Sequence, residues 1–283
     1  MDKDIIKQID LCVFISSKPR FGRFEDYKAT ILSLLQMEDG AFKQKFLSLK
    51  IFKDDIENAN NIIEFFTTLG FEIFIIEDVH NINNEDRYSN RNKFIGGIAQ
   101  DICSFFTQNQ HKFSKYVFVL EDDSPVIIKK NLFKNYINKS IDILKSDNNI
   151  EGIHFLRLSY NEIPCTADDW FLLHKKQIPS QSVEIITDYW YNFQPRINIA
   201  SDLIKVCNII QLNWDNYFKF LHPEDAFDKA YKTYNSQSKS YAFSPRDAYS
   251  IHLGADSRCH ELILNSEKEI KDIYIKNKLN GLA

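Results

Sequence analysis

The sequence predicts an α/β fold with a mostly parallel central sheet flanked by helices, and three observations indicate it. Apolar segments typical of buried strands alternate with amphipathic segments typical of helices through the first half of the chain. Several strand-like segments stop abruptly at polar or acidic residues, as strands do where they reach a ligand-binding sheet edge. Hydrophobic residues make up 44% of the 283 residues and charged residues 26%, the composition of a globular protein with a substantial core.

In the first half of the chain, strand and helix signals follow one another in turn. Apolar or alternating side chains predict strands at residues 11–17, 46–52, 71–79, 116–123 and 152–160. Helical spacing of apolar side chains predicts intervening helices at residues 24–37, 56–70, 93–108 and 131–146. Because a helix between two strands returns the chain to the same edge of the sheet, this order predicts parallel neighbours joined by right-handed crossovers.

The second half of the chain is less regular. Residues 182–196 mix strand and turn signals, and residues 199–212 have helical spacing. Pro223 followed by two acids predicts the start of a helix over residues 222–234. Residues 241–254 read as a loop and a strand, and a charged helix is expected from Glu261 onward. We find no repeat or flexible linker, so we expect a single domain.

Charge and cysteine usage restrict the class of protein. The net charge of −4 offers no overall basic field, so general nucleic-acid binding is not expected. The five cysteines are an odd number, no two of them are close neighbours, and the first ten residues do not read as a secretory signal. No apolar run approaches the roughly 20 residues of a membrane span. We therefore expect a reduced, cytoplasmic protein, which peripheral attachment could still bring to a membrane.

Three consecutive acids follow the apolar run of residues 116–120: Glu121, Asp122 and Asp123. Like charges side by side repel each other, so a fold tolerates them mainly where water or a cation takes up the charge. Carboxylates are hard oxygen ligands for Mn²⁺ or Mg²⁺. If the strand continues, Glu121 and Asp123 share one face of it. The acids predict a metal and diphosphate site, and the alternative is a solvated acidic turn.

Two further pieces of sequence could complete such a site. Glu224 and Asp225 lie about a hundred residues downstream, and a carboxylate there could take the proton of an attacking hydroxyl. Their alternative role is to stabilise the start of a helix. His252 ends a short apolar run and could add an imidazole ligand to the metal, although a histidine at such a position is more often packed in the core.

Basic residues near two strand ends could bind phosphate. Pro19 and Arg20 follow the first expected strand, and Arg91 and Lys93 precede the Gly96-Gly97 pair. The glycines could let the helix approach a ligand closely, or they could pack against a neighbouring element. The sequence contains neither a P-loop nor a GxGxxG motif, so it supports neither a Walker-type nor a Rossmann dinucleotide site.

In this order, the pieces resemble the GT-A superfamily of nucleotide-sugar-dependent glycosyltransferases. The matching segments are LCVFISSKPR, LKIFKDD, the DxD-type motif VFVLEDDSPV, PED and SIHLG, over roughly residues 10–255. The motif reads Glu-Asp-Asp rather than Asp-x-Asp, and YWYNFQPR stands where the superfamily has a glycine-rich loop. The resemblance implies a GT-A-like, Rossmann-like domain over residues 1–283. Residues about 10–130 would bind the nucleotide sugar, and residues about 131–283, the less regular half, would bind the acceptor.

The resemblance also implies roles for individual residues. Asp123 and His252 would hold the metal, and Glu121 and Asp122 would lie nearer the ribose and phosphates. Asp225, or less favourably Glu224, would be the catalytic base. The remaining nucleotide-binding residues would be Ser16, Pro19, Arg20, Asp54, Arg91 and Lys93.

The implied activity is Mn²⁺- or Mg²⁺-dependent transfer of a sugar from a nucleoside diphosphate sugar, with a UDP-sugar favoured, to a glycan or other hydroxyl acceptor, with inversion. Two alternatives remain open. The chain could bind sugar nucleotides without catalysis, or it could be a metal-dependent phosphoesterase or nuclease. A phosphoesterase would need further ligands beside the acidic motif, and the candidates are Asp54, Asp55, Asp78 and His80. The sugar, the acceptor and the oligomeric state are left open.

Overall fold

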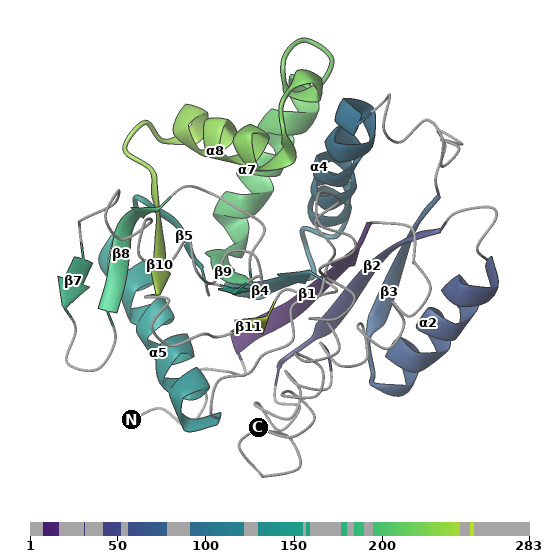
Figure 1. The fold of residues 1–283 in the computed structure, drawn as a ribbon, viewed down its shortest axis with the longest axis horizontal. Helices are drawn as coiled ribbons and strands as arrows, with labels where there is room; N and C mark the ends of the chain where they lie inside the picture. Colours follow the sequence, from purple (N-terminus) through teal and green to yellow (C-terminus); the bar gives the residue numbers. More distant parts are fainter. Residues whose placement is uncertain are drawn as a thin grey trace.

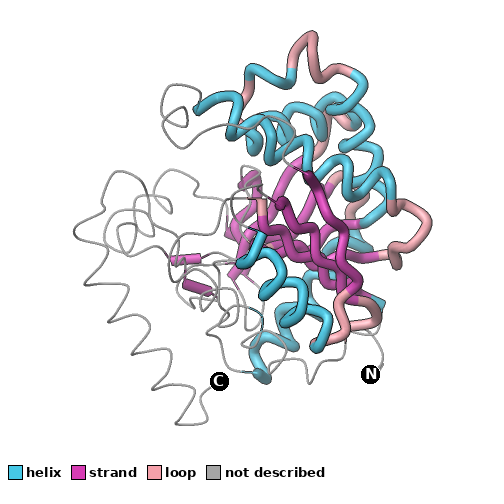
Figure 2. Tube along the Cα trace, turned by 90° about the vertical axis from the view of Figure 1, so that its right-hand side faces the viewer, coloured by secondary structure: helices cyan, strands magenta, loops and turns pink. Residues whose placement is uncertain are grey.

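The computed structural model describes residues 8–16, 31, 42–51, 56–77, 91–121, 130–154, 157–158, 177–179, 184–189, 195–243 and 250–251. In these ranges the chain forms an α/β body in which one nine-stranded sheet lies between two layers of helices (Figure 1). Figure 2, turned by 90°, shows the strands between the two groups of helices. The α/β class predicted from the sequence is confirmed.

The sheet has the strand order β3-β2-β1-β4-β9-β5-β10-β8-β7. Its strands, in chain order, are β1 (Ile9–Ile15), β2 (Lys45–Ile51), β3 (Glu72–Glu77), β4 (Tyr116–Glu121), β5 (Ile150–His154), β7 (Gln177–Pro179), β8 (Glu184–Tyr189), β9 (Arg196–Ile199) and β10 (Lys239–Phe243). A separate two-stranded sheet pairs β6 (Arg157–Leu158) with β11 (Ser250–Ile251). The helices are α2 (Ile56–Thr68), α4 (Arg91–Gln108), α5 (Lys130–Ser146), α7 (Ala200–Leu212), the 3₁₀-helix η2 (Phe218–Phe220) and α8 (Pro223–Tyr234).

The prediction of a mostly parallel sheet holds for one half of the sheet only. Strands β3, β2, β1 and β4 are parallel to one another, as expected for strand–helix–strand units. Strand β9 runs antiparallel to both of its neighbours, β4 and β5, and β8 runs antiparallel to β10 and β7. The chain forms β7 and β8 between β5 and β9, so β9 is not reached from β5 through a single strand–helix–strand unit. The sheet as a whole is therefore mixed.

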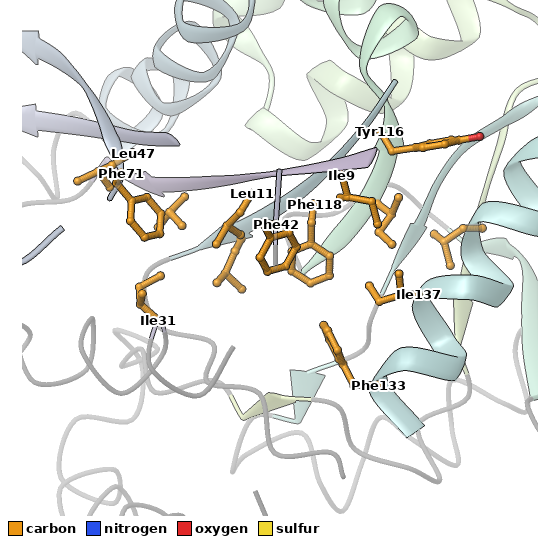
Figure 3. Close-up of a cluster of buried hydrophobic side chains, with 14 of the residues drawn as sticks. Ile9, Leu11, Ile31, Phe42, Leu47, Phe71, Tyr116, Phe118, Phe133 and Ile137 are labelled. Carbon is orange, nitrogen blue, oxygen red and sulfur yellow. The ribbon is translucent and has the colours of Figure 1, made fainter. Parts of the chain in front are cut away.

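Helices bury both faces of the central strands. Every residue of β1 is buried, which explains why its sequence reads as an almost continuous apolar run. Ile9 and Leu11 point into a cluster with Phe118 of β4 and with Phe133 and Ile137 of α5 (Figure 3). Side chains of α2 complete this cluster.

The opposite face of the sheet packs against α4, α7 and α8. Cys12 and Phe14 of β1 lie in this second cluster, together with aromatic side chains of α4. The rings of Phe14 and Phe105 meet edge to face, with centroids 5.2 Å apart and planes at 88°. Since helices cover both faces, a ligand is expected to meet the polar side chains of the central strands at the strand ends.

Two expected helices lie largely or wholly outside the described residues. Of the segment 24–37 only Ile31 is described, and it is helical and buried. The tail from Glu261 lies outside altogether. Among the helices that the structure does describe, none combines the length and the apolar character needed to cross a bilayer.

Candidate functional site

The strand order identifies the edge of the sheet where a ligand is expected. After β1, the chain places β2 and β3 on one side of it and β4 on the other. The carboxyl ends of β1 and β4 therefore form a topological switch point, the place where open α/β sheets bind ligands. The polar residues that end these two strands were already candidates from the sequence.

Ser16 and Glu121 lie at this switch point. Glu121 is the last residue of β4 and pairs with Phe14, and Ser16 follows Phe14 by two residues. Val119 and Phe14 belong to the cluster under α4 and α7, so the alternation of side chains assigns Glu121 and Ser16 to that same face. Both side chains are half-buried. The structure thus brings together a carboxylate and a hydroxyl that were predicted separately.

Lys50 of β2 adds a third polar side chain next to Glu121 and Ser16, and it was not predicted from the sequence. Ile15 pairs with Leu49, so Ser16 and Lys50 follow one another across neighbouring strand ends. The Nζ atom of Lys50 lies 3.2 Å from Oδ2 of Asp101 on α4, and the two side chains are only 12% and 10% exposed. In FLSLKIF, residues 46–52, the alternation puts Lys50 on the face opposite Leu47, Leu49 and Ile51, so the sequence alone does not mark it as buried.

Gly97 of α4 lies beside this ion pair. A Cβ atom added at Gly97 would be 3.7 Å from Lys50 Nζ, an ordinary van der Waals distance. Two roles were considered for the Gly96-Gly97 pair, close approach to a ligand or packing against a neighbouring element. The neighbour that the structure gives Gly97 is the charged end of the Lys50 side chain, not an apolar group.

Farther along the same edge, Arg196 and His154 lie opposite each other on neighbouring strands, and both are buried. Arg196 begins β9 and is opposite both Val119 of β4 and His154 of β5. Its side chain is 1% exposed and is the largest of the fully buried side chains. Arg196 is the last residue of the segment YWYNFQPR, of which residues 190–194 lie outside the described residues. A buried guanidinium two positions from Asn198 was not expected from that aromatic segment.

On the face of the sheet that packs against α8, a network of hydrogen bonds joins β5, β9 and β10 to that helix. Asn198 Nδ2 donates to the carbonyl oxygen of Glu151 at 2.7 Å and to the Tyr231 hydroxyl at 3.3 Å. Ser240 Oγ donates to Oε2 of Glu151 at 2.7 Å. Burial raises the pKa of the Glu151 carboxyl to about 7, with Asp228 of α8 adding to the rise, while Ser238 and Ser240 oppose it.

The two candidate base residues lie differently on α8. The helix begins at Pro223, with His222 as its N-cap, and it buries Ala226, Ala230 and Tyr231 among others. Asp225 is exposed and lies on the side away from this buried face. The Glu224 side chain is 17% exposed, and its Oε2 lies 3.5 Å from Nδ1 of His222. The sequence ranked Asp225 first; Glu224 is the more buried of the two carboxylates, and which of them acts as the base stays a prediction.

The remaining predicted site residues are not placed by the structure. Arg91 and Lys93 lie in the first turn of α4, and only the course of their backbone is described. The others lie outside the described residues: Pro19, Arg20, Asp54, Asp122, Asp123 and His252, as do Asp55, Asp78 and His80 of the phosphoesterase alternative. Within the part of the chain that is described, no three His, Cys, Asp or Glu residues are grouped so as to hold a metal ion.

Three buried cysteines have unreactive surroundings. Cys12, Cys103 and Cys207 are free thiols without solvent exposure. Burial raises the pKa of the Cys103 thiol well above its usual value, with Cys207 beside it adding to the rise, and burial does the same for Cys12. Since the thiolate is the nucleophile, these residues are not suited to covalent catalysis.

No protein-family model matches this sequence, and no curated protein matches it. Among solved structures, the chain is similar to the mannosyltransferase Ktr4p from S. cerevisiae, whose X-ray structure is in complex with GDP. The two are 13% identical, the match covers 83% of this chain and 70% of that chain, and the TM-score is 0.38. At that TM-score the likeness has no weight for either fold or activity.

Proposed function

We propose that this chain is a metal-dependent glycosyltransferase that moves a sugar from a nucleoside diphosphate sugar, with a UDP-sugar favoured, to an acceptor hydroxyl with inversion. The proposal rests on the position of the residue that ends β4. There Glu121 opens the acidic motif at the switch point of the parallel strands, next to the end of β1 and Ser16. A carboxylate cluster at this edge is suited to a charged, metal-bound nucleotide.

The donor atoms of the motif fit a hard divalent cation. Glu121 is half-buried at the strand end, and Asp122 and Asp123 follow it directly in sequence. Carboxylate oxygens are the ligands that Mn²⁺ and Mg²⁺ prefer. Asp123 and His252 are the residues proposed to hold the cation, with Glu121 and Asp122 nearer the ribose and phosphates. When bound, the cation would neutralise charge on the departing diphosphate.

The chain's own residues would bind the donor and handle the acceptor proton. The Ser16 hydroxyl and the basic residues Arg20, Arg91 and Lys93 are proposed to bind the nucleotide around the switch point, together with Pro19 and Asp54. Glu224, or Asp225 next to it, would take the proton of the acceptor hydroxyl as its oxygen attacks the anomeric carbon. Attack opposite the leaving diphosphate gives inversion.

Thermal shift and transfer assays test the proposal. UDP-, GDP- and CMP-sugars are added with and without Mn²⁺, and at least one is expected to raise the Tm of the wild type and to be consumed when an acceptor is present. Asp123→Ala should remove the Mn²⁺-dependent part of the shift. Asp215→Ala is the matched control, because Asp215 is a strongly exposed acid on the turn after α7. Identical titrations with and without Mn²⁺ would contradict the metal role of Asp123.

The same assays separate the alternatives. Binding of a sugar nucleotide with no transfer or hydrolysis would identify a catalytically inactive sugar-nucleotide-binding protein. Hydrolysis of phosphoesters without sugar transfer would identify a phosphoesterase.

A further inference from the structure

Glu151 of β5 carries a carboxyl group that is buried at the contact between the sheet and α8. The residue is 4% exposed, and its Oε2 accepts a hydrogen bond of 2.7 Å from Ser240 Oγ of β10. Its Oε1 is buried too, and among the described residues none forms a hydrogen bond of ordinary geometry with that atom. An ionised carboxylate with one buried, unsatisfied oxygen is costly, whereas protonation turns one oxygen into a donor and removes the charge.

The charged groups around Glu151 do little to stabilise its ionised form. On α8, Asp228 raises the pKa of Glu151 and Lys232 lowers it, but the Nζ atom of Lys232 lies 2.6 Å from Oδ2 of Asp228 and is paired within the helix. On β9, Arg196 lies opposite His154, which is three residues farther along β5 than Glu151. Together with burial, these surroundings leave the carboxyl with a pKa of about 7, against 4.5 for an exposed glutamate.

The basic residue of β10 is engaged elsewhere as well. Lys239 begins this strand, and its Nζ atom lies 3.3 Å from Oδ2 of Asp147 in the turn before β5. The described cations near the contact therefore have carboxylate partners of their own, and a negative charge on Glu151 would have to be stabilised by the Ser238 and Ser240 hydroxyls.

Polar and apolar contacts join α8 to the rest of the fold. The Tyr231 hydroxyl accepts a hydrogen bond of 3.3 Å from Asn198 Nδ2 of β9, and Asn235, the C-cap, donates through Nδ2 to Asn149 Oδ1 at 2.9 Å. Phe227 and other apolar side chains of the helix pack in the cluster that α8 shares with α4 and α7. Since a helix of 12 residues is only marginally stable alone in water, α8 depends on these contacts.

We infer that α8 is a proton-controlled element of the fold: it stays seated on β5, β9 and β10 while Glu151 is protonated, and it opens locally when Glu151 ionises. Ionisation puts a negative charge into the buried contact near Asp228, and opening lets water reach the carboxylate. Because α8 carries Glu224 and Asp225, opening would also move both candidate bases, and this consequence alone rests on the proposed function.

The direction of the pH effect follows from linkage. In the closed state Glu151 holds its proton up to a pH of about 7, whereas in the open state it releases the proton near pH 4.5. Between these values the open state binds fewer protons, so a rising pH favours it. The opening constant of α8 should therefore rise by up to about tenfold per pH unit between about 4.5 and 7 and level off above.

Hydrogen exchange of the full chain, followed by mass spectrometry, tests the inference without any nucleotide. Protection factors correct for the pH dependence of the intrinsic exchange rate. In α8 they should be at least about tenfold lower at pH 8 than at pH 5. At pH 8 they should also be at least about tenfold smaller than the unfolding equilibrium constant from urea unfolding, since α8 opens without the rest of the fold. Protection of α8 that is independent of pH, or that equals the global unfolding constant, would overturn the inference.

Variants then assign the effect to its group. Glu151→Gln resembles the protonated side chain, so the protection of α8 should differ by less than about threefold between pH 5 and pH 8. Glu72→Gln is the matched control, because Glu72 is a strand glutamate in an exposed ion pair with Lys112, and it should keep the wild-type pH dependence. Asp228→Asn leaves Glu151 in place and should raise the protection of α8 at pH 8. A pH-dependent loss of protection that persists in Glu151→Gln, or an unchanged α8 in Asp228→Asn, would contradict the assignment.

Discussion

The two halves of the sheet carry their polar groups in different places. In the parallel strands β1, β2 and β4, the interior positions are apolar apart from Asp10 and Ser48, and the polar residues collect at the ends. In the mixed half, polar side chains are buried within the strands: Glu151, His154, Arg196, Asn198 and Ser240. The parallel half is thus a rigid apolar frame that presents ligand-binding groups at its edge. The mixed half contains a polar network that reaches α8 through the Tyr231 hydroxyl.

This difference predicts a division of labour between nucleotide binding and proton transfer. Glu224 belongs to α8, which packs against the mixed half through Tyr231 and Asn198. We expect Glu224→Gln to lower kcat about 10²- to 10⁴-fold, the usual contribution of a general base, while the affinity for the nucleotide stays within about twofold. Asp225→Asn, on the exposed side of the same helix, is the paired variant and should retain most of the activity. Initial rates and nucleotide titrations of both variants provide the measurement.

The two variants also test the ranking made from sequence. If Asp225→Asn loses transfer and Glu224→Gln keeps it, the exposed carboxylate is the base and the sequence ranked the pair correctly. If both variants lose nucleotide binding, the helix belongs to the binding half of the molecule and the division of labour is wrong.

The buried network gives the mixed half a pH dependence. The pKa of Glu151 is 4.5 in an exposed chain and about 7 in the fold, because burial penalises the ionised carboxylate. Between these values the unfolded chain has released its proton and the folded one has retained it. The unfolding free energy should therefore fall as the pH rises from about 4.5 to about 7, by on the order of 3 kcal/mol, and level off above.

Glu151→Gln keeps the shape of the side chain and removes the titration. We expect the variant to be more stable than the wild type at pH 8, and its unfolding free energy to change much less between pH 4.5 and 7. Urea unfolding at several pH values checks both. The groups that act on Glu151 are Asp228 and Lys232 of α8, Ser238 just before β10 and Ser240 of β10, so a slope that persists in Glu151→Gln would assign the titration to another group.

The same contrast explains what the sequence could predict. In the first half, an apolar run such as β1 has one stable placement, between two helix layers, so the strands, their parallel order and the position of Ser16 and Glu121 follow from local patterns. Lys50 was missed because its partner Asp101 is 51 residues away. In the second half, β9 contains Arg196 and Asn198, which lower its apolar signal, and its antiparallel direction depends on contacts with β4 and β5. Such contacts leave no periodic trace in the sequence.

Two glycine-to-alanine substitutions, one in each half of the molecule, are expected to have the smallest effects on stability and to test the same comparison. Gly152 lies in β5, and a Cβ there would be 2.5 Å from Nδ2 of Asn198 and 3.2 Å from the Ile197 carbonyl oxygen. Gly152→Ala should therefore displace the Asn198 amide from the network and cost about 1–3 kcal/mol, the range for an unsatisfied buried polar group. Gly70 lies in the turn after α2 with φ at +74°, and the nearest atom to its Cβ position is Lys45 Nζ at 3.6 Å. Gly70→Ala should cost about 1 kcal/mol, from backbone conformation alone.

A shared background variant separates the two causes. In Asn198→Ala the amide that a Gly152 side chain would meet is gone, so the cost of Gly152→Ala should shrink by at least about 0.5 kcal/mol, the threshold for coupled sites. The cost of Gly70→Ala should be the same in both backgrounds, because the turn after α2 shares no contact with Asn198. Urea unfolding of the wild type, the three single variants and the two double variants measures both differences. Equal costs for Gly152→Ala in the two backgrounds would show that the Ile197 carbonyl, and not the polar network, requires glycine in β5.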